Sequence, residues 1–170
     1  LISTITKPTR TNYDFQGYYT GTNGTGTQCI NKSGSITASN ATFTANTTLY
    51  AYWTPKVYTI TLNNQSATTA GTTAYYEKYN TGKYTSSACT TSISTITKPT
   101  KTGHTFKGYY TGTNGTGTQY INESGLILAG STTFSSNTTL YAKWDLNKYD
   151  VKYVDRIKGT DIELGSSTES

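Results

Sequence analysis

Very few residues of this chain have side chains suited to acid–base or metal chemistry. His104 is the only histidine, so a serine–histidine–aspartate triad or a zinc site would have to use it. The two cysteines, Cys29 and Cys89, are distant in the chain and too few to supply the remaining zinc ligands. We therefore predict no catalytic residue, no metal site and no cofactor, and we interpret His104 as an aromatic position of a strand.

The two cysteines leave one structural question open. In an oxidising compartment, Cys29 and Cys89 could join as one disulfide. Their spacing does not establish the pair, and two separate thiols are the favoured alternative.

The carboxylates and the glycine-rich loops also lack the patterns that catalysis and ligand binding require. Glu123 and Asp14 are not shared between the two copies of the repeat described below, where Lys32 and Thr105 take their places. The repeated unit therefore has no acid pair of the kind that glycoside hydrolases use. The loop GTNGTGT, residues 112–118, lacks both the Gly-Lys-Ser/Thr of a phosphate loop and the acidic ligands of calcium. We predict that the chain is not an enzyme.

An internal repeat is the strongest signal in the sequence. Residues 1–53 align without gaps on residues 92–144, and 37 of the 53 positions are identical. Self-similarity of this kind is typical of tandem modules. We divide the chain into the C-terminal part of a first module (1–53), a complete second module (54–144) and a tail (145–170). The tail is interpreted as the start of a further module, or as a segment whose strand completes the first module within the chain or from a neighbour.

The composition indicates β-structure with a polar surface. The chain has 16 tyrosines and no methionine, and only 14% of its residues are charged. Abundant threonine, serine, asparagine and glycine favour strands and turns over helices. The basic residues of the repeats are dispersed singly, which argues against nucleic-acid binding, and no stretch is apolar enough to cross a membrane. Such a surface is common in secreted proteins of the cell wall.

Alternating hydrophobic residues predict strands at 56–62, 72–78, 104–110, 139–144 and 149–154, and hence a mainly β fold. A short helix is expected within 86–96, where Ile93 and Ile96 share one helical face before Pro99. The predicted core gathers the inward-facing residues of both copies. These are Phe15, Tyr19, Leu49, Trp53, Ile60, Leu62, Phe106, Tyr110, Leu140 and Trp144.

Paired tyrosines are the leading candidates for a binding surface. At 18–19, 75–76 and 109–110, strand alternation predicts one buried ring and one exposed ring. Because exposed aromatic rings stack on sugars and contact proteins, Tyr18, Tyr75, Tyr109 and the loop residue Asn114 form the candidate ligand surface. The alternative is that these tyrosines only cover a sheet edge or a neighbouring module.

The segments KPTKTGHTFKGYYT (98–111) and NTTLYAKW (137–144) resemble the Listeria-Bacteroides repeat, the B-repeat of internalin B-type bacterial surface proteins. Both motifs recur, in the same order, in the first copy. His104 stands where the family usually has tyrosine, and Tyr109 where it has tryptophan. The resemblance implies a β-grasp-like (α+β) module, in which a small mixed sheet folds against one short helix, and it brings no catalytic residue. The start of the tail also looks like the opening of a mucin-binding repeat.

These features predict non-catalytic, extracellular modules of a bacterial cell surface or cell wall. The leading hypothesis is a stalk or spacer with some adhesion, whose partners are the neighbouring repeat modules. The alternative is an adhesin module that recognises a glycan or a host protein through exposed tyrosines. We expect no nucleic-acid partner and no membrane insertion of these residues.

Overall fold

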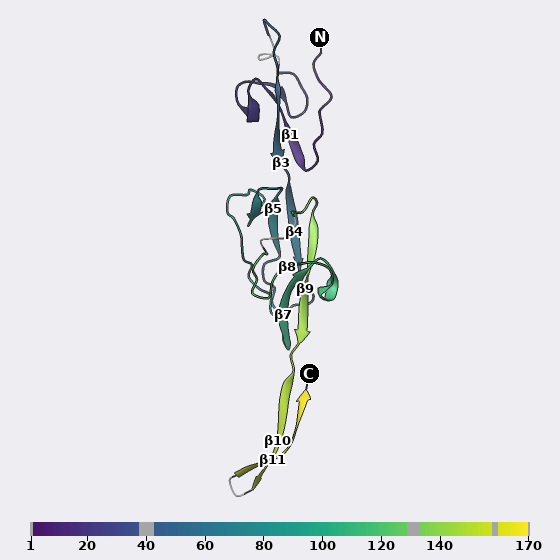
Figure 1. Ribbon diagram of the computed structural model, residues 1–170, viewed down its shortest axis with the longest axis vertical. Helices are drawn as coiled ribbons and strands as arrows, with labels where there is room; N and C mark the ends of the chain where they lie inside the picture. The colour runs from purple at the N-terminus through teal and green to yellow at the C-terminus, as the bar shows by residue number, and fades with distance from the viewer. Residues whose placement is uncertain (1, 38–42, 129–132, 158–159, 170) are drawn as a thin grey trace. The chain divides into compact units, whose positions relative to one another are not determined.

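The chain folds into β-sheets in the computed structural model, which describes residues 2–37, 43–128, 133–157 and 160–169 (Figure 1). The first sheet has the order β2-β1-β3, formed by β1 (Tyr13–Tyr19), β2 (Gln28–Asn31) and β3 (Tyr50–Pro55). Both outer strands run antiparallel to β1. All three strands belong to the first copy of the repeat.

A second sheet of six strands belongs to the second copy and has the order β6-β5-β4-β9-β7-β8. Its strands are β4 (Val57–Asn63), β5 (Ala74–Lys78), β6 (Gly82–Tyr84), β7 (His104–Tyr110), β8 (Gln119–Ile121) and β9 (Thr138–Leu146). The sheet is mixed, because β4 and β9 run parallel while β7 pairs antiparallel with β8 and β9. In the repeat, β9, β7 and β8 correspond to β3, β1 and β2.

The tail forms a hairpin of two long strands, β10 (Tyr149–Ile157) and β11 (Thr160–Glu169). These strands pair with each other in a sheet of their own. The expectation that the strand at 149–154 completes the first module within the same chain is therefore wrong. Its partner is the nearby β11, because a hairpin closes a shorter loop than a return to residues 1–53 would.

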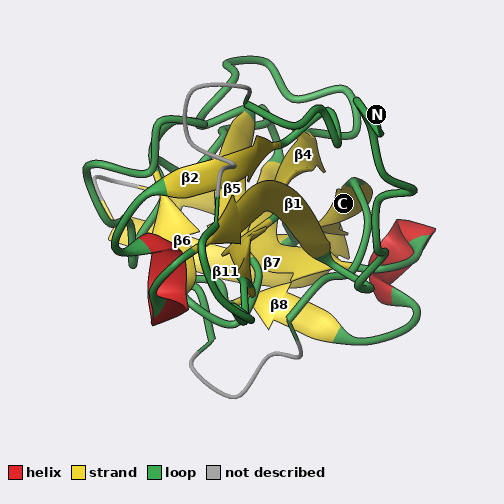
Figure 2. Cartoon of the chain, turned by 90° about the horizontal axis from the view of Figure 1, so that it is seen from above, coloured by secondary structure: helices red, strands yellow, loops and turns green. Residues whose placement is uncertain are grey.

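The five predicted strands are confirmed, but the predicted helix is not. Residues 86–96 form turns, bends and a bridge between Tyr84 and Ser92. In this segment Cys89 has a positive φ of 54°, which interrupts a right-handed helix. Among the described residues, the helical elements are two single 3-10 turns, Thr22–Gly24 and Thr113–Gly115 (Figure 2). The fold is mainly β, and a short helix at 86–96 has no place in it.

The predicted core of the second copy is largely confirmed. Ile60, Leu62, Phe106 and Leu140 are buried, whereas Trp144 and Tyr110 are half-buried. The Phe106 ring packs edge-on against Trp144, with centroids 5.5 Å apart.

The first copy repeats this aromatic geometry with less burial. Its Phe15 and Trp53 rings have centroids 5.4 Å apart, at the same interplanar angle of 62° as the second copy's pair. Phe15, Tyr19, Leu49 and Trp53 are nevertheless only half-buried. The first copy contributes three strands to its sheet where the second contributes six, so fewer neighbours cover its apolar residues.

The chain divides into two compact units whose border does not follow the repeat. Unit 1 comprises Leu1–Thr59, Tyr76–Ser92 and Thr132–Asn137, and unit 2 comprises Ile60–Tyr75, Ile93–Ser131 and Thr138–Ser170. Unit 1 therefore joins the first copy to the start of β4, the end of β5 and all of β6. Unit 2 contains the aromatic cluster around Phe106.

Candidate functional site

A β-bulge in β7 decides which tyrosine of the 109–110 pair faces inward. The pairing of β7 with β9 shifts between Phe106 and Gly108, so Lys107 is the extra residue. Gly108 has a φ of 113°, and a Cβ there would lie 2.2 Å from the Ile121 carbonyl oxygen, so only glycine fits. The shift brings the rings of Phe106 and Tyr109 together, with centroids 5.3 Å apart.

The expectation that Tyr109 is exposed is therefore wrong. Its side chain is 0% exposed, and its hydroxyl donates a hydrogen bond to Oδ1 of Asn64. The backbone carbonyl of Asn64 also accepts a hydrogen bond from Trp144 Nε1, at 3.1 Å. Burial raises the pKa of the Tyr109 phenol, so this hydroxyl stays protonated. Tyr109 is therefore a structural residue. Its hydrogen bond to Asn64 holds the 63–66 segment against the aromatic cluster of Phe106, Tyr109 and Trp144.

The expectation for Tyr75 is wrong for a simpler reason. On β5, Tyr75 and Glu77 alternate inward, and Tyr75 is 0% exposed. Its neighbour Tyr76 faces the other side and is half-buried beside Tyr84 of β6. Sequence alternation identified an inward and an outward ring, and the assignment of the two rings was reversed.

The remaining two residues of the predicted ligand surface do not form one site with these. Tyr18 is half-buried, and its ring packs on Phe15 with centroids 5.3 Å apart. Asn114 is exposed in the 113–115 turn. It lines a hollow of about 380 Å³ together with His104 and Trp144. Of the four residues of the predicted surface, Asn114 is the one that is exposed, while Tyr18 is half-buried and Tyr75 and Tyr109 are buried.

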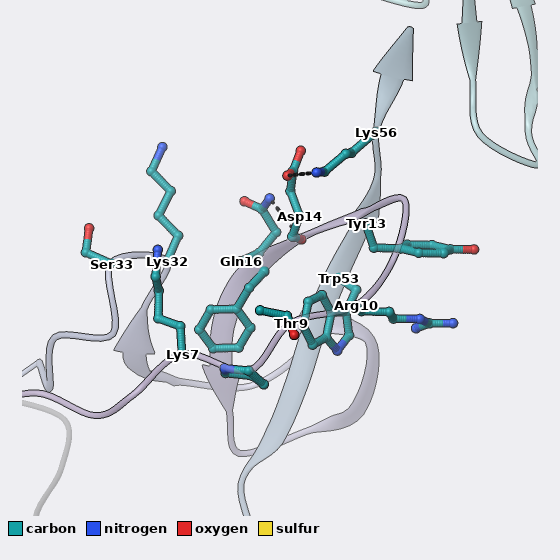
Figure 3. A pocket seen from close by; sticks show the side chains of 12 residues that line it. Lys7, Thr9, Arg10, Tyr13, Asp14, Gln16, Lys32, Ser33, Trp53 and Lys56 are labelled. Atoms are coloured by element: carbon teal, nitrogen blue, oxygen red, sulfur yellow. Dashed lines mark hydrogen bonds and ion pairs between the residues drawn. The ribbon is translucent and has the colours of Figure 1, made fainter. Parts of the chain in front are cut away.

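A larger hollow lies in unit 1, where sequence reasoning placed no site. It has a volume of about 640 Å³, and four of its lining residues are cationic. Lys7, Arg10 and Lys32 are exposed, and Lys56 is half-buried. Figure 3 shows the labelled side chains gathered around this hollow, which we call the basic hollow.

The charges of the basic hollow are only partly compensated. Asp14 is its one carboxylate, and Asp14 Oδ1 lies 3.9 Å from Lys56 Nζ. The Arg10 guanidinium lies over the Tyr13 ring, 4.1 Å from the ring centroid. The aromatic rings of Phe15 and Trp53 also line the hollow. Cations that outnumber the carboxylates attract an anionic group. Aromatic rings beside them can stack on the apolar face of a sugar that carries this group.

The comparison with known families supplies the identity of the repeat. The sequence profile of the Listeria-Bacteroides repeat domain matches residues 1–52 and 58–143. The chain belongs to the Listeria-Bacteroides repeat family. No curated protein and no solved structure matches the chain. The family is associated with bacterial surface proteins and is generally non-catalytic.

The basic hollow is not a shared feature of the two Listeria-Bacteroides repeats. In the second copy, Glu123 stands in place of Lys32 and Lys107 in place of Gln16. Lys107 Nζ and Glu123 Oε2 form an ion pair of 2.6 Å. This hydrogen bond raises the pKa of Lys107 and lowers the pKa of Glu123. The second copy therefore pairs two opposite charges at the positions where the first copy has the uncharged Gln16 and the cationic Lys32.

The one histidine and the two cysteines of the Listeria-Bacteroides repeats occupy ordinary structural positions. His104 Nδ1 lies 2.9 Å from the backbone oxygen of Thr102, at the start of β7. Cys29 is buried, Cys89 is half-buried, and both are free thiols, which favours the second of the two alternatives for the cysteines. Within the described ranges, His, Cys, Asp and Glu side chains form no group of three able to hold a metal ion. The described part of the chain also has no helix with the length and apolarity to cross a membrane.

Proposed function

We propose that this chain is a spacer of an extracellular bacterial surface protein, in which consecutive Listeria-Bacteroides repeats are held in fixed succession. The repeats would be tandem modules with the borders 1–53 and 54–144, and the tail would begin a third. Their partners are then the neighbouring modules, and no reactive site is needed.

The joint between repeats carries this proposal, because the same hydrogen bond occurs at the end of both copies. The Lys56 amide donates to the Asn12 carbonyl at 2.9 Å. At the corresponding place in the second copy, the Asn147 amide donates to the Gly103 carbonyl at 2.8 Å. A single residue, Lys56, separates β3 from β4. A connection this short leaves the two strands little freedom to move apart.

Further contacts within unit 1, from side chains and from the backbone, reinforce the first joint. The Tyr58 hydroxyl donates to Asn12 Oδ1 at 2.9 Å. The Tyr79 amide donates to the Lys56 carbonyl at 2.9 Å, and the Tyr79 ring packs edge-on against Tyr13, with centroids 5.8 Å apart. Residues of one copy are thereby bonded to residues of the next. This is the nearest-neighbour interface that gives a repeat array its stiffness.

The strand order of the second copy supports a β-grasp-like description of the module. Its first and last strands, β4 and β9, are parallel neighbours in the middle of the sheet. Each is flanked on its outer side by a further strand, β5 or β7. Loops and turns occupy the crossover where a helix was expected.

The spacer proposal is tested by measuring how rigid the first joint is. Spin labels are placed at two exposed positions of unit 1, Thr20→Cys in the first copy and Ser87→Cys in the second, with both native cysteines replaced by alanine. Pulsed electron–electron double resonance (an electron paramagnetic resonance method) then gives the distribution of distances between the two spin labels. We expect a single narrow distribution of label distances in the chain with the joint intact. A broad distribution in that chain would contradict the proposal.

Two variants sharpen this test. Tyr79→Ala removes the ring contact with Tyr13 and should broaden the distribution without shifting the secondary structure in circular dichroism. Tyr50→Ala is the control, because it removes a tyrosine ring of the first copy that is exposed and lies outside the joint, whereas the Tyr79 ring is half-buried. Equal broadening in both variants would show that the joint contacts do not hold the modules.

Weak adhesion to anionic polymers is the second candidate function, and the basic hollow favours it. Four cations face one carboxylate around the rings of Phe15 and Trp53. A carboxylated or phosphorylated glycan supplies the opposite charge and flat sugar faces for those rings. This adhesion replaces the expectation of binding through exposed tyrosines at 75 and 109, since both rings are buried.

The adhesion candidate is tested with a uronic-acid oligosaccharide as the probe. Isothermal titration calorimetry should show binding that weakens as the salt concentration rises. The double variant Lys7→Gln and Lys32→Gln should abolish it, whereas Lys78→Gln, outside the hollow, should leave it unchanged. Binding that is lost equally in all variants, or absent in the unaltered chain, would exclude this role.

A further inference from the structure

A gap in strand pairing produces the smaller of the two hollows, which lies within unit 2. β4 ends at Asn63, which pairs with Tyr141, whereas its parallel neighbour β9 continues to Leu146. Beyond that point the 63–66 segment lies beside β9, and its Asn64 bonds to Trp144. The space between this segment, β9 and the start of β7 has a volume of about 380 Å³, and we call it the Trp144 hollow. Its described lining residues all lie between 63 and 144, inside the complete second copy.

Two neighbouring residues of the 63–66 segment hold a backbone conformation that their residue types disfavour. Gln65 has a φ of 49° and Ser66 a φ of 59°, in the left-handed region that glycine and asparagine adopt far more readily. Both residues line the Trp144 hollow. Strained backbone of this kind persists only where the surrounding contacts impose it, and it clusters at binding and catalytic sites. The strain therefore directs attention to the hollow that these two residues wall.

Hydrogen bonds from β7 and β9 impose the shape of this wall. Asn64 accepts one hydrogen bond from the Tyr109 hydroxyl and another from Trp144 Nε1. Asn63 Oδ1 accepts from the Gln65 backbone amide at 3.0 Å and from Gln65 Nε2 at 3.3 Å. The wall is thus built by the fold itself, which lowers the entropy that binding of a ligand would cost.

The start of β7 supplies a cation and an imidazole to the same hollow. The His104 amide donates to the Lys101 carbonyl at 3.0 Å, so a tight turn keeps these two residues adjacent. His104 Nδ1 donates to the Thr102 carbonyl at 2.9 Å, because a carbonyl oxygen only accepts. Nε2 is then the ring nitrogen that can accept a hydrogen bond from a ligand. Lys101 is half-buried and takes part in none of the ion pairs of the described residues.

The chemistry of the lining matches a sugar. The side-chain amides of Gln65 and Asn114 and the hydroxyl of Ser66 both donate and accept hydrogen bonds, as sugar hydroxyls do. Trp144 adds an aromatic surface. Among the described lining residues, Lys101 is the one lysine or arginine, and none is acidic. The volume lies at the small end of the range of about 300–1,000 Å³ for ligand sites, which limits the ligand to about one or two sugar rings.

We propose that the Trp144 hollow binds a sugar ring that carries a single carboxylate. Lys101 pairs with the carboxylate, while His104 and Asn114 bond to ring hydroxyls and Trp144 contacts the apolar face of the ring. A doubly charged phosphate would bring a second negative charge for which the described lining offers no further lysine or arginine. This site lies in the second copy and shares no residue with the basic hollow, so neither function proposed above depends on it.

The first test follows the two tryptophan indole N–H signals in heteronuclear NMR spectra. Trp144 lines this hollow and Trp53 lines the basic hollow, so each signal reports on one site. Titration with methyl β-D-glucuronide should shift the Trp144 signal in a saturable way. Methyl β-D-glucoside has the same ring without the carboxylate, and it should bind roughly 10-fold more weakly. Because the Trp53 signal is read separately, failure of one site is distinguished from failure of the other.

A charge variant tests the role of Lys101. Lys101→Gln should lower the affinity for the glucuronide by roughly 10-fold, to that for the glucoside, and leave glucoside binding unchanged. Lys98→Gln is the matched control, because it removes the same charge from an exposed lysine of the same segment that does not line the hollow. The proposal is overturned if the Trp144 signal shows no saturable shift, if the two sugars bind equally, or if both variants lose equal affinity.

The second test asks whether the strained wall serves binding. Ser66→Gly removes a hydroxyl from the hollow, yet it also relieves the left-handed φ, because glycine adopts that conformation without steric cost. The variant should melt no lower than the unaltered chain while binding the glucuronide roughly 5-fold more weakly. Asn80→Gly is the matched control, since Asn80 is exposed, has a φ of 49° and lies outside the hollow. Unchanged glucuronide binding in Ser66→Gly, or an equal loss in Asn80→Gly, would exclude this segment as the wall of the site.

Discussion

Leu49 and Leu140 occupy the same place in two copies of one sequence, and they differ in what covers them. Leu140 lies in β9 beside Leu62 of the parallel strand β4 and is 0% exposed. Leu49 has no described strand on that side and is half-exposed. Replacing each leucine by alanine therefore measures how much the parallel strand contributes.

The expected magnitudes follow from burial. A fully buried leucine replaced by alanine typically costs 2–5 kcal/mol, and the loss is larger where the cavity cannot collapse. Strands β4 and β7 fix both sides of Leu140, so we expect a loss of about 3 kcal/mol for Leu140→Ala. Leu49→Ala removes a side chain that already meets water and should cost about 1 kcal/mol.

The two tryptophans give a separate optical signal for each copy. Trp53 reports on the first copy and Trp144 on the second. Leu140→Ala is measured in a Trp53→Phe background and Leu49→Ala in a Trp144→Phe background, by urea unfolding followed by fluorescence. With a slope of about 1.2 kcal/mol per molar urea for a module of this size, the midpoints should fall by about 2.5 M and less than 1 M.

Equal losses at the two sites would refute the reasoning, because they would mean that β4 does not stabilise Leu140. The milder pair Leu140→Val and Leu49→Val serves if Leu140→Ala prevents folding. In that pair the same order of losses is expected, with smaller values.

Three further perturbations test the interior. Tyr109→Phe should lower the free energy of unfolding by about 1.5 kcal/mol, because Asn64 loses a buried hydrogen-bond donor. Tyr18→Phe, the same change at the matching position of the first copy, should alter the free energy of unfolding by less than about 0.5 kcal/mol. Gly108→Ala should cost about 3 kcal/mol in the same urea assay, since φ is 113° and Ile121 O blocks the Cβ; no loss would exclude the bulge. Burial raises the pKa of Glu77 above its usual 4.5, only partly offset by Lys83. Because folding raises that pKa, Glu77 favours the native state below pH 4.5 and the advantage is lost as the pH rises through the native pKa. The stability of Glu77→Gln relative to the unaltered chain should therefore increase with pH above 4.5, and a difference independent of pH would contradict this assignment.

The sequence by itself determined the features that depend on local pattern. The gap-free repeat, the five alternating strands and the family follow from residues read in order. Strand periodicity also identified Ile60, Leu62, Phe106 and Leu140 as core residues, and all four are buried. Alternation depends only on the extended backbone, in which every second side chain faces the same way.

Some features depend on a partner strand or on a break in the alternation of side chains along a strand. Only the tertiary structure decided these features. The bulge at Lys107 turned Tyr109 inward, and Gly108 within the strand was the one sequence signal that pointed to it. The helix expected at 86–96 gave way to turns that bond to Tyr84 and Thr85. The basic hollow brings together Lys7, Lys32 and Lys56, which the sequence shows only as dispersed charges.

Leu49 and Leu140 show why burial cannot be read from local sequence. Leu49 and Leu140 share the local text NTTLYA, so no local rule distinguishes them. Their burial differs because β4 lies beside one and not the other. Local sequence sets the conformation that a segment can adopt, whereas burial and exposure depend on which distant strand pairs with it.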